Sequence, residues 1–172
     1  MDNSRHSSLC YHKPRWSFKP KGGLDMAQHS VTISIAKPVD AVFLFFTMPT
    51  NLLKLAPPDL HIELVEGPVI LQLGSRVKWK GRRWGVAQTM IQEVTSFEPG
   101  KLIVEEQKQG PLAKLIHARH FSASQTGTLI REDIQFEPPG GLLGRLVTAD
   151  FVRKDLEKLI AFRETKLREL FG

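Results

Sequence analysis

The sequence has one cysteine and no long apolar run, and both shortages exclude classes of protein. Only Cys10 is a cysteine among the 172 residues, so neither an internal disulfide framework nor a cysteine-rich metal site can form. The densest apolar stretch, residues 41–46, falls far short of the ~20 residues that cross a bilayer. We therefore expect neither a disulfide-stapled domain nor an integral membrane protein, and the low cysteine content favours a cytoplasmic location.

The positive charge is concentrated near the N-terminus. The formal net charge is +6, and residues 1–28 supply about half of it with five basic and two acidic residues. The remaining chain is only mildly basic, so we expect no nucleic-acid partner. Residues 1–28 also lack hydrophobic periodicity and are broken by prolines and glycines, which predicts a disordered or loosely attached leader before one domain over residues 29–172.

Two interpretations of the N-terminal segment stay open. Residues 1–28 have no apolar core of the kind that a secretory signal needs, but their basic character leaves a transit peptide open. Met26 stands directly before the first predicted strand. Translation starting at Met26 would remove the leader altogether.

Strand patterns fill the middle of the chain. Residues 31–36 alternate and are β-branched, which predicts a strand. Two short helices are predicted over residues 38–46 and 51–55, each stopped by proline. Short connections between the later strands predict antiparallel neighbours. These later strands are residues 60–66, 76–80, 86–97, 101–108, 114–123 and 127–136.

The last segment, residues 142–171, is predicted to be one long amphipathic helix. Its apolar residues recur at helical spacing, and ~28 helical residues would be about 42 Å long. A helix of this length on one face of an antiparallel sheet gives an α+β fold. A strongly bent sheet would leave a small-molecule cavity beneath the helix, with the glycine-rich residues 140–144 as a mobile flap at its entrance.

Polar residues are predicted on the inner face of the last two strands. Alternation places His117 and Arg119 on one face of residues 114–123. If the turn is centred near residue 125, Arg119 lies opposite Glu132, and we expect an ion pair because buried charges need partners. These three groups would bind the polar end of a ligand. The other residues predicted to bind the ligand are Trp79, Met90, Gln92, Glu106, Gln107, Leu115, Phe121, Ile134, Val152, Leu156 and Leu159.

Other roles for these polar residues stay open. They could be satisfied core groups with no ligand. In an enzyme, His117 would act as acid and base and Glu132 would orient it, although no nucleophile is evident. His117 and His120 fall on opposite faces of a strand, so we expect no shared metal ion and no cofactor.

The basic and aromatic run at residues 78–85 is predicted to be a strand end and turn. Val77 and Trp79 alternate inward while Lys78 and Lys80 face solvent, and residues 81–83 form the turn. The same residues would also suit an anionic lipid surface. A transient contact with a membrane surface therefore stays open.

Five motifs together carry a family resemblance. They are NLLKLAPPDL at 51–60, EEQKQGP at 105–111, LIHARHF at 115–121, GTLIREDIQFEPPGG at 127–141 and FVR at 151–153. In this combination the chain resembles the START-like (SRPBCC) superfamily over about residues 30–172. It is most similar to the ligand-binding bacterial branch, which is related to polyketide cyclases and coenzyme Q-binding START domains.

The resemblance implies a helix-grip fold. Such a fold has a curved antiparallel sheet of about seven strands wrapped around a long C-terminal helix, with two short helices after the first strand. It implies that the chain binds or carries a hydrophobic small molecule (a lipid, a quinone or a polyketide-like ring), with a cyclase or dehydratase using His117 and Glu132 as the alternative. The chain departs from the family's Trp-x-His-x-His-x-Phe strand at Leu115 and Arg119.

Overall fold

The computed structural model describes residues 26–172, apart from the side chains of residues 142 and 143. A leader was predicted at residues 1–28. Its residues 1–25 lie outside the described residues. Ala27 and Gln28 already belong to the first strand, so the folded part begins slightly before the predicted residue 29.

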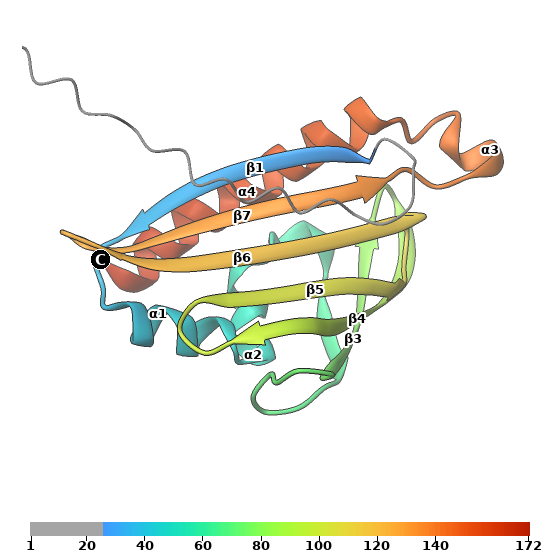
Figure 1. Cartoon of the computed structure of the whole chain (residues 1–172). Helices are drawn as coiled ribbons and strands as arrows, with labels where there is room; N and C mark the ends of the chain where they lie inside the picture. The colour runs from blue at the N-terminus through green and yellow to red at the C-terminus, as the bar shows by residue number, and fades with distance from the viewer. Residues whose placement is uncertain (1–25) are drawn as a thin grey trace, which may run out of the picture.

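Seven antiparallel strands form one sheet in the order β1-β7-β6-β5-β4-β3-β2 (Figure 1). Each strand pairs with its neighbours along an antiparallel ladder, with small shifts in the β2–β3 and β4–β5 pairs. The strands are β1 (Ala27–Ile35), β2 (Glu63–Glu66), β3 (Arg76–Arg83), β4 (Val86–Glu98), β5 (Leu102–Gln109), β6 (Lys114–Ser124) and β7 (Gly127–Glu137).

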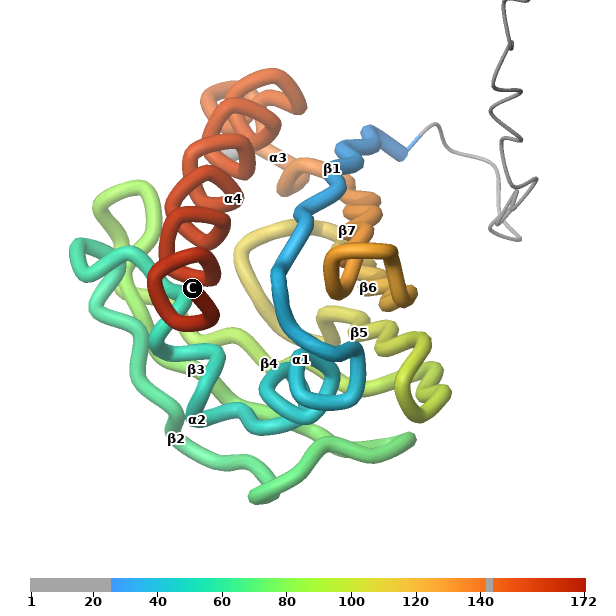
Figure 2. Tube along the Cα trace, turned by 90° about the vertical axis from the view of Figure 1, so that its left-hand side faces the viewer, coloured from blue at the N-terminus to red at the C-terminus, as the bar shows by residue number. Residues whose placement is uncertain are grey.

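The long C-terminal helix lies on the concave side of this sheet, and the sheet curls around it (Figure 2). The predicted α+β class and helix-grip arrangement are confirmed. Among the described residues, no helix is both long enough and apolar enough to cross a membrane. The helices are α1 (Val39–Phe46), α2 (Pro49–Leu52), the 3₁₀ turns η1 (Leu53–Leu55) and η2 (Pro58–Leu60), α3 (Gly141–Gly144) and α4 (Ala149–Phe171).

The pairing of β6 with β7 agrees with the predicted register. Ser124 pairs with Gly127 across the turn, which brings Arg119 opposite Glu132 and His117 opposite Ile134. Gly127 is required here, because a Cβ atom at this position would lie 2.2 Å from the carbonyl oxygen of Ile35. The register fixes which side chains of the two strands face α4.

The β3–β4 connection differs from the predicted turn at residues 81–83. β3 continues to Arg83, which pairs with Val86. Trp84 and Gly85 form the turn, and both have positive φ angles, of 54° and 78°. Two-residue hairpin turns of this mirror-image type match the twist of the strands and favour glycine at the second position. The strand is therefore longer than its basic residues suggested.

The last helix is shorter than predicted. α4 begins at Ala149 and has 23 residues, about 34 Å at 1.5 Å per residue. The side-chain oxygen of Thr148 accepts a hydrogen bond of 3.3 Å from the Phe151 N–H, which caps the helix. Leu146 precedes the helix, and it and Leu170 are exposed. The buried face of α4 consists of Val152, Leu156, Ile160 and Leu167.

One further helix and one further strand begin at residues other than those predicted, in each case because of a proline. α2 begins at Pro49 instead of residue 51, because proline suits the first turn of a helix. The strand predicted at 60–66 begins only at Glu63, because Pro58 starts the turn η2.

A polar layer separates two apolar clusters in the core. One cluster includes Phe46, Phe121, Ile130 and Leu167. The other includes Leu115, Ile134, Phe136 and Leu156. Between them along β6 stand His117 and Arg119, which are 7% and 5% exposed. Buried charged groups are costly unless they are paired, so this layer marks the site.

Candidate functional site

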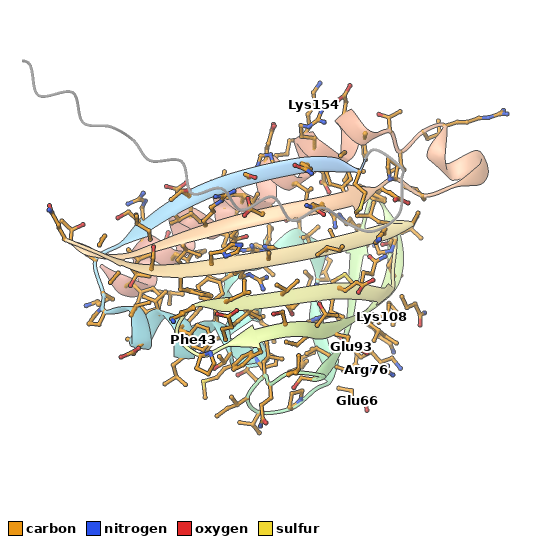
Figure 3. The ribbon with its side chains drawn as sticks, viewed as in Figure 1. Phe43, Glu66, Arg76, Glu93, Lys108 and Lys154 are labelled. Atoms are coloured by element: carbon orange, nitrogen blue, oxygen red, sulfur yellow. The ribbon has the colours of Figure 1, made fainter. Side chains whose placement is uncertain are left out.

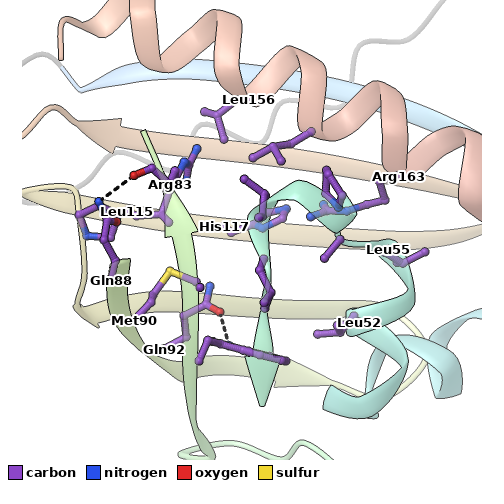
Figure 4. A pocket seen from close by; sticks show the side chains of 18 of the residues that line it. Leu52, Leu55, Arg83, Gln88, Met90, Gln92, Leu115, His117, Leu156 and Arg163 are labelled. Carbon is purple, nitrogen blue, oxygen red and sulfur yellow. Dashed lines mark hydrogen bonds between the residues drawn. The ribbon is translucent and has the colours of Figure 1, made fainter. Parts of the chain in front are cut away.

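A cavity of about 200 Å³ lies between the inner face of the sheet and α4 (Figure 4). A water molecule occupies ~30 Å³ in the liquid, so the cavity has room for several waters or for part of an organic ligand. Most of its wall is apolar, as in small-molecule sites. The apolar lining residues are Leu52, Leu55, Ala56, Pro57, Leu60, Ile62, Trp79, Met90, Pro111, Leu115, Ile134, Leu156, Leu159 and Ile160.

The structure brings nine of the fourteen predicted binding residues to the cavity wall. Their role in ligand binding stays a prediction. Phe121 and Val152 instead pack in the two apolar clusters, and Glu132 lies behind the wall. The nine are Trp79, Met90, Gln92, Leu115, His117, Arg119, Ile134, Leu156 and Leu159.

Five side chains are joined by hydrogen bonds and ion pairs into a continuous series through the core, here called the polar chain. Arg119 Nη1 donates to Glu105 Oε2, and Arg119 Nη2 donates to His117 Nδ1 at 3.1 Å. His117 Nε2 donates to Glu132 Oε2 at 2.8 Å. Arg163 Nη1 donates to the same oxygen of Glu132. The polar chain therefore runs from β5 across β6 and β7 to α4.

The predicted ion pair between Arg119 and Glu132 was wrong. The two residues are directly opposite in the β6–β7 register, but the guanidinium reaches back to Glu105 on β5. Glu132 is paired with His117 and with Arg163 from α4. Diagonal neighbours on one sheet face lie within reach of long side chains, so the directly opposed partner is not the only choice.

Sequence reasoning missed Glu105 and Arg163, and both carried a signal. Glu105 shares its strand face with Ile103 by alternation, and both are buried. Arg163 falls on the buried stripe of α4, three residues after Ile160 and four before Leu167. In each case a charged residue at an inward position marked the polar chain.

Glu106 was predicted at the position in the site where the structure places Glu105. Glu106 lies on the outer face, where Lys108 Nζ donates to it at 3.2 Å. Lys108 also approaches Glu93, which pairs with Arg76, and Figure 3 shows this ionic group outside the sheet. Adjacent strand residues point to opposite faces, so Glu105 points into the core and Glu106 points to the outer face.

Gln107 holds a loop and does not line the cavity. Its Nε2 donates to the Leu112 carbonyl oxygen at 2.7 Å. The side chain thus fixes the connection from β5 to β6. Its predicted contact with the polar end of a ligand is not supported by this arrangement.

The hydrogen bonds fix the tautomer of His117. Arginine can only donate, so Nδ1 is the accepting nitrogen and Nε2 carries the hydrogen that is donated to Glu132. Burial, and then the positive charge of Arg119, lower the pKa of His117, although Glu132 opposes this. His117 is therefore a neutral imidazole with both nitrogens engaged.

The partners of Glu132 keep it ionised. Burial alone would raise the pKa of this completely buried carboxyl group, but Arg163 and then His117 lower it far below the ordinary value. Burial likewise opposes the charge of Arg119, and Glu105 and then Glu132 raise the pKa of Arg119 above its ordinary value. Two carboxylates and two guanidiniums balance, so the polar chain has no net charge.

The β3–β4 hairpin is tied to α4 through one carboxylate. Arg83 Nε and Trp84 Nε1 both donate to Asp155 Oδ2, at 2.8 and 3.1 Å. The Trp84 ring also meets Phe151 edge to face, with centroids 5.8 Å apart. These contacts hold the hairpin against the helix where β3 forms part of the cavity wall.

The cavity reaches the surface beside this hairpin. Lys80 and Arg82 are exposed, and both line the cavity. Gln88 lies on the facing strand, with its Nε2 donating to the Arg83 carbonyl oxygen at 3.4 Å (Figure 4). The entrance predicted at residues 140–144 stays a prediction.

The arrangement offers little for nucleophilic or metal chemistry. Among the described residues that line the cavity there is no serine, threonine, cysteine or tyrosine. Within residues 26–172 no group of three or more His, Cys, Asp or Glu side chains is placed to hold a metal ion. The wall can enclose an apolar molecule and donate hydrogen bonds to it.

Comparisons with solved structures agree with the fold. The protein CV1439 from Chromobacterium violaceum superposes with a TM-score of 0.66 at 14% identity, over 84% of this chain and 96% of that one. The aromatase/cyclase di-domain StfQ of the steffimycin biosynthetic pathway gives 0.64 at 16% identity, over 83% and 48%. Major latex-like protein 151 from Panax ginseng gives 0.63 at 13% identity, over 86% and 98%.

Sequence comparison identifies the family. No curated protein sequence matches the chain. The model of the family described as "polyketide cyclase / dehydrase and lipid transport" matches residues 26–172, which include every strand of the sheet and α4. The chain therefore belongs to the polyketide cyclase / dehydrase and lipid transport family, within the START-like superfamily.

Proposed function

We propose that the protein binds and carries a hydrophobic small molecule in the cavity between the sheet and α4, without transforming it. One observation carries this proposal. The cavity wall is apolar on both the sheet side and the helix side, with Trp79 and Leu156 as examples, while the buried charges are paired with one another. Such a wall suits binding and leaves no reactive group free.

The ligand class follows from the two kinds of wall. An apolar body would lie against Trp79, Met90, Leu156 and Leu159. A polar end would lie near His117 and its arginine neighbours. Lipids, isoprenoid quinones and polyketide-like rings all combine an apolar body with a polar end, and the family description names lipid transport beside polyketide cyclisation.

A cyclase or dehydratase is the second candidate, and one contact favours it. His117 and Glu132 are 2.8 Å apart, as a base and its orienting carboxylate would be. However, Nδ1 of His117 already accepts from Arg119, so the imidazole has no lone pair left for a substrate proton. This favours binding over catalysis.

The variant His117→Gln separates the two candidates. A glutamine can donate to Glu132 and accept from Arg119, but it cannot act as a base at neutral pH. A carrier would retain its affinity within a fewfold. An enzyme would retain binding and lose turnover of the substrate found in the cavity.

Native mass spectrometry of the protein purified from its own host tests the proposal. We expect a bound small molecule that N-phenyl-1-naphthylamine, a neutral apolar probe, displaces. A protein that carries no ligand and does not bind the probe would contradict the proposal. Cell fractionation and co-sedimentation with vesicles would test the expected cytoplasmic location and the transient membrane contact.

A further inference from the structure

The charged residues that line the cavity all have the same sign. They are Lys80, Arg82, Arg83, Arg119 and Arg163. By the alternation of β3, the exposed side chains of Lys80 and Arg82 lie on the opposite face from Trp79, beside the opening of the cavity. No aspartate or glutamate is among the described residues that line it. A wall with cations and no anions selects against a positively charged ligand, because like charges repel in a site of low dielectric.

The carboxylates that balance these arginines lie behind the wall. Glu105 pairs with Arg119 and Glu132 pairs with Arg163, and neither carboxylate lines the cavity. Each pair therefore has its positive member on the cavity side. A group in the cavity meets N–H donors first and carboxylates second.

Arg119 has hydrogen-bonding capacity that the described residues do not use. The residue is only 5% exposed, and its Nε has no partner among those residues. A buried polar group without a partner is destabilising. An acceptor on a ligand would supply that partner.

Gln92 adds another donor to the wall. Trp79 Nε1 can only donate, and it lies 3.0 Å from Gln92 Oε1 (Figure 4). This contact fixes the orientation of the amide, and the NH₂ group is left for the cavity. Glu132 Oε1 also has no partner among the described residues, but Glu132 does not line the cavity. The available polar atoms of the lining residues Arg119 and Gln92 are donors, which a hydrogen-bond acceptor complements.

We propose that the ligand is an amphiphile with an anionic end of the carboxylate type, anchored between Arg163 of α4 and Arg119 of β6. This rests on the function proposed above. A planar guanidinium matches a carboxylate in geometry and charge. The two arginines come from opposite walls of the cavity, on either side of His117 in the polar chain. Lys80 and Arg82 form no ion pair within residues 26–172, and these exposed cations beside the opening would attract an anion as it enters.

Three matched probes test the charge preference in the full-length protein. Decanoate, 1-decanol and decylammonium share one chain and differ in the end group. Each would be titrated against bound N-phenyl-1-naphthylamine near neutral pH, at low salt and below its aggregation limit. We expect decanoate to bind about tenfold more tightly than decanol, a difference of about 1.4 kcal/mol, and decylammonium to bind most weakly.

A paired substitution tests the anchor. Arg163→Met together with Glu132→Gln removes the ion pair without leaving a buried charge unpaired. We expect the preference for decanoate to fall to near onefold while decanol binds as before. Arg153→Gln, an exposed position on α4, is the control and should keep the full preference. If the double variant does not fold, Arg163→Lys keeps the charge but loses the planar fork, and the preference should fall severalfold.

Two results would overturn the proposal, and they are distinguishable. Equal binding of decanoate and decanol to the wild type would show that the cavity does not anchor an anion. A preference that persists undiminished in the folded double variant or in Arg163→Lys would show that Arg163 is not the anchor. In either case the carrier function would stand. Failure of the naphthylamine and of all three probes to bind would remove the carrier function, and the anionic ligand with it.

Discussion

Arg163 on α4 donates a hydrogen bond to the completely buried carboxylate of Glu132 on β7, and this ion pair joins helix to sheet through the middle of the core. His117 is the only other residue that donates to that carboxylate among the described residues. An uncompensated buried charge is strongly destabilising. The position of α4 over the cavity therefore depends on a pair that neither element can satisfy alone.

Removing one member of the pair should cost much more than removing both. Arg163→Met should lower the free energy of unfolding by about 3–5 kcal/mol, and Arg163→Met with Glu132→Gln should recover most of that loss. Urea unfolding of the two variants measures the difference. Arg153→Met is the matched control, because Arg153 pairs with Asp150 at the surface, and it should change the free energy by less than about 1 kcal/mol. A double variant no more stable than the single one would contradict the coupling.

The neutral His117 predicts a loss of stability below neutral pH. The pKa of His117 is lowered in the folded protein, so as the pH falls through the unfolded value of about 6.5 the unfolded chain takes up a proton that the folded protein does not. Stability should fall by up to about 1.4 kcal/mol per pH unit as the pH decreases below about 6.5. Arg119, Glu105, Glu132 and Arg163 are the charged groups around it in the polar chain.

The variant His117→Gln should flatten this part of the pH profile. Glutamine keeps both hydrogen bonds and does not titrate, so the slope between about pH 6.5 and 5 should decrease. The lowered pKa of Glu132 contributes stability that is present above about pH 4.3 and lost below it. That lower limb should survive in His117→Gln. An unchanged slope above pH 5 would mean that His117 is not the neutral group described here.

The sequence predicted the sheet well, because its physical signals are local. Alternation and turn residues gave the strand faces and the β6–β7 register, and these brought His117 and Glu132 to one face. The turn at Trp84 and Gly85 was missed, because a tryptophan with a positive φ is rare and the basic residues before it resemble a loop. The predicted start of the long helix was too early, because Leu146 fits the helical period but precedes the cap at Thr148.

The ion-pair partners within the site were harder to predict, because they depend on how the helix packs on the sheet in the folded protein. Arg119 faces Glu132 in the register, yet it pairs diagonally with Glu105 because α4 provides Arg163 for Glu132. No sequence period relates residue 163 to residue 132. Only the distance between α4 and β7 in the folded chain decides that pairing.

Loosening the β3–β4 hairpin should speed ligand exchange. Asp155→Ala removes the acceptor shared by Arg83 and Trp84, and Arg83 lines the cavity. We expect the dissociation rate of bound N-phenyl-1-naphthylamine to rise about tenfold, since a hydrogen bond to a charged group contributes about 1.5–3 kcal/mol. Stopped-flow displacement measures this rate.

A neighbouring carboxylate provides the control for the hairpin. Glu157 is exposed on the same helix, and Glu157→Ala should leave the dissociation rate unchanged. If Asp155→Ala also leaves the rate unchanged while the fluorescence of the tryptophans reports a freed hairpin, then ligand exchange does not pass this edge of the cavity.

The binding of N-phenyl-1-naphthylamine to Leu159→Trp tests most directly whether the space under α4 is a binding cavity. Leu159 is half-buried and lines it, so the larger ring should occupy the space at little cost to folding. We predict affinity at least about tenfold weaker, or about 1.4 kcal/mol, with a Tm within a few degrees of wild type. Leu170→Trp, at an exposed position on the same helix, should bind as the wild type does. Unchanged affinity in Leu159→Trp, or a loss that only follows a falling Tm, would mean that the apolar stripe of α4 is core packing and not the wall of a ligand site.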